Sequence, residues 1–157
     1  MNDTDYRLLE SQLRVLLGDE TDALAASSNF VALLYNALDD VNWLGIYVLR
    51  GDELVLGPFQ GKTACVRIKL GDGVCGTAAA TLATQRIDDV HAFPGHIVCD
   101  ADSRSEIVVP LLVNHELVGV LDIDSPSLAR FSETDQRGIE TVCKTFCFLQ
   151  EARSEFI

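Results

Sequence analysis

Basic side chains are scarce in this sequence. Its 157 residues include 12 lysines and arginines against 24 aspartates and glutamates, which gives a net charge of −12. Nucleic acids and anionic membrane surfaces repel such a chain, so we expect it to bind neither. Apolar runs are also short, well below the ~20 residues that cross a bilayer. The N-terminal MNDTDYRLLE is charged and lacks an apolar secretory segment, so no export is predicted.

Cysteine is present, but not in the pattern of a disulfide scaffold or a structural zinc site. The chain has five cysteines, an odd number, and no two of them form a C-x-x-C pair. Without an export signal, this usage predicts reduced thiols and a cytoplasmic location. With 48% hydrophobic residues, a chain of this length can bury a real core, and a single domain over 1–157 is expected.

Hydrophobic periodicity predicts an α+β fold with helices packed on a central antiparallel sheet. Apolar residues recur at helical spacing in two segments within residues 4–38. A last helix is predicted over 133–152, where Ser132 is the N-cap residue and Asp135 its capping-box partner. The sheet and the active-site loops are expected between them, over 42–124.

Turn signals divide this middle region into strands. Arg50, Gly51 and Asp52 separate two alternating segments and indicate a β-hairpin. Further strands are predicted at 64–70, 107–113 and 117–124, the last two joined by a short turn.

Aromatic residues gather on one face of the first strand. Alternation places Trp43, Gly45, Tyr47 and Leu49 on the same side. Gly45 would leave a gap between the two rings. The pattern fits either a plain core face with a spacer glycine or the wall of a pocket for a small apolar group.

Carboxylates continue an apolar face of the last strand. Alternation places Val118, Val120, Asp122 and Asp124 on one side, and Glu106 would join them if its strand pairs through the short turn. A solvated strand end would explain these acids. However, acids beside a core face have raised pKa values and can donate protons near neutral pH.

The glycines of GDGVCG (71–76) formally match the dinucleotide-binding pattern G-x-G-x-x-G. Asp88 and Asp89 lie about where a ribose-binding acid is expected. The neighbouring segments do not form a βαβ unit, however. We therefore expect these glycines to supply backbone freedom at a tight turn into a helix.

The remaining thiols and imidazoles leave several interpretations open. His91, His96 and Cys99 could contribute zinc ligands, although the set lacks a fourth ligand at a recognisable spacing. His96 could equally act as the base of a cysteine hydrolase with Cys99 as nucleophile. Cys143 and Cys147 have i,i+4 spacing on the last helix and are expected to be core thiols.

Five segments together resemble the free methionine-(R)-sulfoxide reductases, which are single-domain enzymes with the GAF fold. The segments are NWLGIYV, GPFQGKTACVRI, GDGVCGTAAA, HAFPGHIVCDADSRSEIVVPL and GVLDIDSP. The most specific feature of the resemblance is the set of three cysteines, Cys65, Cys75 and Cys99, each in its family context. By resemblance, Cys99 is the nucleophile, Cys65 the resolving thiol and Cys75 an auxiliary or alternative nucleophile.

The resemblance also implies roles for the acids and aromatic residues. Glu106 and Asp124 would polarise the sulfoxide, and Asp122 would help to hold the amino acid's ammonium group. Trp43 and Tyr47 would enclose the S-methyl group.

The implied reaction is the reduction of free L-methionine-(R)-sulfoxide by a cysteine thiolate. A sulfenic acid forms, then an intramolecular disulfide, which thioredoxin reduces. No metal, flavin or nicotinamide cofactor is implied, and a homodimer is expected. The rival hypothesis is a GAF sensor that binds a small ligand without turnover.

Overall fold

The computed structural model describes residues 1–97, 101–151 and 156–157. Six antiparallel strands form one sheet in the order β3-β2-β1-β6-β5-β4. The strands are β1 Trp43–Arg50, β2 Glu53–Gln60, β3 Arg67–Lys69, β4 Gln85–Ile87, β5 Ser105–Val113 and β6 Glu116–Ser125. The helices are α1 Asp3–Leu17, α2 Ala23–Ala37, α3 Gly73–Thr81 and α4 Glu133–Gln150, with a 3-10 turn, η1, at Val90–Ala92. The predicted α+β architecture is confirmed.

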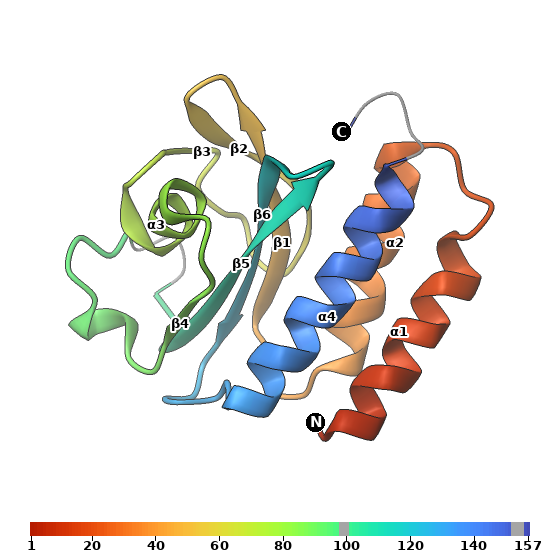
Figure 1. The fold of residues 1–157 in the computed structure, drawn as a ribbon. Helices are drawn as coiled ribbons and strands as arrows, with labels where there is room; N and C mark the ends of the chain where they lie inside the picture. The colour runs from red at the N-terminus through yellow and green to blue at the C-terminus, as the bar shows by residue number, and fades with distance from the viewer. Residues whose placement is uncertain (98–100, 152–155) are drawn as a thin grey trace.

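The helices divide between the two faces of the sheet (Figure 1). Helices α2 and α4 pack on one face, and α1 lies against both of them. Of the described α-helices, only α3 packs on the opposite face. None of the described helices is long and apolar enough to cross a membrane.

Strand alternation sorts the apolar side chains into two cores. Leu44 and Ile46 of β1 point into the larger core under α2 and α4. Trp43 and Tyr47 of the same strand point into the smaller core under α3, as the predicted shared face requires. Val118 departs from the prediction, because it packs against the larger core while Val120 lies in the smaller one.

Local sequence signals mark several element boundaries correctly. Gly51, with φ of 65°, forms the predicted turn between β1 and β2. The Ser132 hydroxyl accepts a hydrogen bond from the Asp135 N–H at 3.1 Å, and the predicted capping box begins α4. The strand predicted at 64–70 is shorter than expected, and β4 and η1 were not predicted.

Candidate active site

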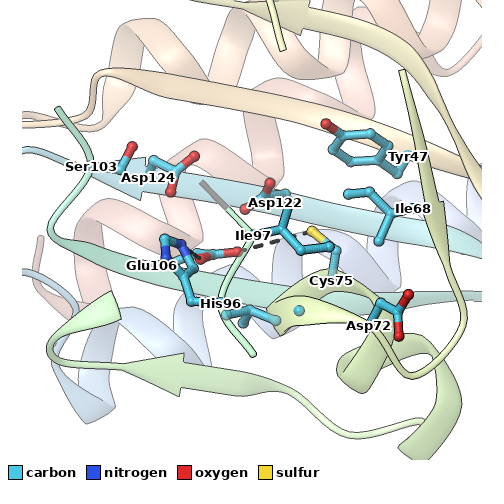
Figure 2. A pocket seen from close by; sticks show the side chains of 12 residues that line it. Tyr47, Ile68, Asp72, Cys75, His96, Ile97, Ser103, Glu106, Asp122 and Asp124 are labelled. Atoms are coloured by element: carbon cyan, nitrogen blue, oxygen red, sulfur yellow. Dashed lines mark hydrogen bonds and ion pairs between the residues drawn. The ribbon is translucent and has the colours of Figure 1, made fainter. Parts of the chain in front are cut away.

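The predicted carboxylates meet on the face of the sheet that α3 covers. Strand register places Glu106 of β5 opposite Asp124 of β6, and Val108 opposite Asp122. Alternation then directs Glu106, Asp122 and Asp124 into one cavity (Figure 2). The short turn between β5 and β6 therefore produces the three-carboxylate cluster predicted from the sequence, rather than a solvated strand end.

Helix α3 brings a thiol to this cluster. The Cys75 Sγ atom lies 4.0 Å from Glu106 Oε1. The Cys75 Sγ atom, a carboxylate oxygen of Glu106 and a carboxylate oxygen of Asp122 all lie within 4.8 Å of one another. These three residues are only 4%, 5% and 7% exposed, respectively. The resemblance implies an auxiliary or alternative nucleophile at Cys75, but no sequence pattern indicates its position among the acids.

Glycines before and within α3 allow this close approach. Gly71 and Gly73 have φ of 89° and 60°, in the region that disfavours side chains. A Cβ atom on Gly76 would lie 2.3 Å from the Lys69 carbonyl oxygen. The G-x-G-x-x-G match therefore serves a tight turn and helix packing, as expected. The sheet pairings among the described residues are antiparallel, so these glycines do not belong to a βαβ dinucleotide-binding unit.

Burial dominates the electrostatics of the cluster. It raises the pKa of Glu106 well above its ordinary range, with further contributions from the charges of Asp122 and Asp124. Burial also raises the pKa of Asp122, to about 6. The two groups interact, so the pair retains a proton as the pH approaches neutrality. Such a carboxyl pair is equipped to donate a proton to a bound substrate.

The same environment makes Cys75 a poor nucleophile. Burial raises the pKa of its thiol well above the ordinary range, and the charges of Asp122 and Glu106 raise it further. The thiolate is the reactive form of cysteine, so a thiol with a raised pKa attacks slowly at neutral pH.

His96 lies at the other side of Glu106. The His96 Nε2 atom is 4.0 Å from Glu106 Oε2, and the imidazole side chain is 12% exposed. Burial, with a smaller contribution from His91, lowers the pKa of His96. The ring centroids of His91 and His96 are 6.3 Å apart. Cys99, which both the zinc and the hydrolase hypotheses require, lies outside the described residues.

The predicted aromatic wall is only partly realised. Tyr47 lines the cavity, and its hydroxyl donates a hydrogen bond of 2.9 Å to the Cys65 carbonyl. Trp43 is not among the described lining residues; its ring stacks on Tyr47 with centroids 5.9 Å apart. No gap remains at Gly45, because a Cβ atom there would meet Trp43 at 2.5 Å and Phe59 at 2.6 Å. Gly45 is therefore a spacer glycine on a core face and does not form the wall of a pocket.

The other cysteines fall into two groups. Cys65 is disulfide-bonded, whereas Cys75, Cys143 and Cys147 are buried free thiols. Cys143 and Cys147 belong to the larger core, as predicted. The nucleophile expected at Cys99 lies outside the described residues and stays a prediction.

Several lining residues were not identified from the sequence as part of a site. They are Ile68, Asp72, Gly73, Val74, Ile97 and Ser103. Ser103 is buried, and its hydroxyl accepts a hydrogen bond from Asn42 at 3.2 Å. Its position depends on the packing of distant segments, so no local pattern indicated it.

The chain is similar to known proteins over most of its length. Residues 13–146 match the GAF domain family. The free methionine-R-sulfoxide reductase of Escherichia coli is 55% identical, over 88% of this chain and 85% of that protein. The enzyme of the same name from Saccharomyces cerevisiae is 45% identical, over 77% of this chain and 70% of that protein.

A solved structure shows the same fold. The free methionine-R-sulfoxide reductase from Neisseria meningitidis, in complex with its substrate, superposes with a TM-score of 0.90. It is 44% identical, and the match covers 97% of this chain and 93% of that chain.

Proposed function

This chain belongs to the GAF-domain family of free methionine-R-sulfoxide reductases, and we propose that it reduces free L-methionine-(R)-sulfoxide to L-methionine. The similarity to the Escherichia coli and Neisseria meningitidis enzymes covers most of each chain and supports this assignment.

The buried carboxylate cluster is the observation that carries the proposal. A free amino acid presents an ammonium group, and Glu106, Asp122 and Asp124 converge on a cavity whose described lining contains no lysine or arginine. We infer that Asp122 helps to hold the ammonium group. Glu106 and Asp124 polarise the sulfoxide, and the raised pKa of Glu106 allows it to supply the proton that the oxygen needs.

The chemical step begins at a thiolate. The Cys99 sulfur attacks the sulfoxide sulfur, whose oxygen is protonated by Glu106, and oxygen transfer gives methionine and a Cys99 sulfenic acid. The Cys65 thiol then attacks the sulfenic sulfur, which releases water and forms a Cys65–Cys99 disulfide. A dithiol reductant of the thioredoxin class reduces this disulfide and is itself oxidised.

The described cysteines support this division of roles. The raised pKa of Cys75 makes it unsuited to the first attack, which agrees with an auxiliary role. Cys65 is disulfide-bonded and its segment contacts the Tyr47 hydroxyl, so a resolving thiol here would lie beside the cavity wall.

The aromatic residues define the apolar end of the site. Tyr47 lines the cavity and would contact the S-methyl group directly. Trp43 supports it from behind, because the Trp43 indole N–H donates to the Lys62 carbonyl at 3.0 Å and its ring stacks on Tyr47.

Substrate scope tests the proposed ammonium site. The enzyme should turn over free methionine-(R)-sulfoxide with dithiothreitol as reductant and should be far less active on the same residue within a peptide, where the charge is lost. Equal efficiency on both substrates would contradict the role of the acids. Binding of the free amino acid without turnover would support the rival GAF sensor instead.

The resolving step can be tested separately with Cys65→Ser. This variant should still form one methionine per site in a single turnover and should leave a sulfenic acid that dimedone traps. Steady-state turnover with thioredoxin should collapse. Unchanged thioredoxin-dependent turnover would show that Cys65 does not resolve the sulfenic acid.

A further inference from the structure

The cluster of Cys75, Glu106 and Asp122 combines a sulfur ligand with carboxylate oxygens, a set that a substrate ammonium alone does not require. We propose that these three residues bind a thiophilic divalent cation of the zinc class when no substrate is bound. The cation would then compete with the amino acid for the same carboxylates. Only this competition rests on the function proposed above.

The separations between the ligand atoms fit such a cation. Zinc bonds of about 2.0–2.3 Å in tetrahedral geometry place neighbouring ligand atoms roughly 3.3–3.8 Å apart. The Cys75 Sγ to Glu106 Oε1 distance is 4.0 Å, and the atoms of the three-residue group lie within 4.8 Å of one another. Modest inward movement of these side chains would complete three bonds.

His96 approaches the cluster from the side away from Cys75. Its Nε2 atom is 4.0 Å from Glu106 Oε2, and Glu106 lies between it and Cys75 (Figure 2), so the ligands come from the three-residue group itself. A sulfur ligand favours zinc and its neighbours, whereas magnesium and calcium prefer oxygen ligands. The mixed set therefore points to a thiophilic cation.

An unsatisfied acceptor provides independent support for a ligand at this place. Asp122 is 7% exposed and lines the cavity, and its Oδ1 atom is buried without a hydrogen-bond partner in the structure. A buried polar atom without a partner destabilises the folded state. No lysine or arginine is among the described lining residues, so a bound cation would provide the missing partner.

Cadmium binding tests the proposal without requiring turnover. The full-length protein should be used with Cys65 in its disulfide, the state of the structure, because Cys75 is then still a free thiol. One equivalent of Cd²⁺ should bind and produce the ultraviolet absorption of a thiolate–cadmium bond. Cys75→Ser should abolish this absorption. The matched control Cys143→Ser, which removes a buried thiol from the opposite core, should retain it.

Two further variants keep the test decisive if Cys75→Ser does not fold. Asp122→Asn and Glu106→Gln should each weaken Cd²⁺ binding by more than the roughly 10- to 100-fold typical of losing an outer-shell partner. The proposal is overturned if no thiolate–cadmium absorption develops, if Cys75→Ser retains it, if Cys143→Ser loses it, or if both carboxylate variants bind Cd²⁺ as tightly as the wild type.

Competition separates this proposal from the enzymatic one. Free methionine sulfoxide should displace Cd²⁺ from the disulfide form, which cannot turn it over. Cd²⁺ that binds through Cys75 but is not displaced would overturn the shared-carboxylate assignment. Turnover of the sulfoxide by a protein that binds no Cd²⁺ would overturn the cation site alone.

Discussion

Replacing Asp122 with asparagine should make the protein more stable near neutral pH while impairing its function. Asp122 lies 7% exposed among Cys75, Glu106 and the sheet, and burial raises its pKa from 3.8 to about 6. A raised pKa means that the folded state holds the proton more tightly than the unfolded chain. The ionised carboxylate therefore disfavours folding, and asparagine removes that charge while keeping the shape.

The size and pH dependence of the effect follow from this shift. Below about pH 3 the carboxyl is protonated in both states, and at about pH 4 the substitution should still have only a small electrostatic effect. As the pH rises from 3.8 to about 6, the wild type loses stability. A shift of about 2 pKa units at 1.36 kcal/mol per unit gives a loss of about 3 kcal/mol at neutral pH, which Asp122→Asn should recover.

Urea unfolding at about pH 4 and about pH 7.5 measures this difference. Fluorescence of Trp43, the single tryptophan and 2% exposed, reports the transition. Asp88→Asn is the matched control, because its carboxylate is 68% exposed and its removal should leave the pH dependence unchanged. An Asp122→Asn variant that keeps the wild-type pH dependence, or that is less stable than the wild type at about pH 7.5, would contradict a raised pKa for Asp122.

Three further predictions concern other groups. Glu106→Gln should lower turnover by about 10²-fold or more, because the proton donor is lost; initial rates with dithiothreitol measure this. Asp135→Asn should destabilise the fold by about 3 kcal/mol in urea at neutral pH, because its carboxylate accepts a 2.7 Å bond from the buried Tyr6 hydroxyl. Burial opposes its ionisation, but hydrogen bonds lower the pKa of Asp135 to about 2, so this stabilisation should be lost as the pH falls below about 4 towards 2. Cys143→Ser and Cys147→Ser should lower the melting temperature without changing kcat/KM, and a fall in kcat/KM in folded protein would contradict their assignment to the core.

Much of the fold follows from local patterns in the sequence. The turn at Gly51 and the capping box of Ser132 and Asp135 are short-range signals, and the structure confirms both. Val118 shows the limit of such patterns. The register of β5 and β6 shifts between Leu111 and Leu112, beside this part of β6, so simple alternation placed Val118 on the wrong face.

The sequence predicts those contacts of the candidate site that join residues close together in the chain. Asp122 and Asp124 share a face by alternation, and one short turn brings Glu106 opposite Asp124. The approach of Cys75 to Glu106, by contrast, depends on how α3 packs over the sheet. Only the G-x-G-x-x-G spacing hinted at this close approach, because Gly76 leaves no room for a Cβ atom beside the Lys69 carbonyl.

The most direct test of the proposed chemistry is a single turnover without reductant. Fully reduced protein is mixed with one equivalent of free L-methionine-(R)-sulfoxide, and both the amino acid and the protein's peptides are analysed by mass spectrometry. We expect one methionine per site and one new disulfide between Cys65 and Cys99, with Cys75 still free. Cys99→Ser should form no methionine. Methionine formation in Cys99→Ser, or failure of the wild type to consume the sulfoxide, would contradict the account.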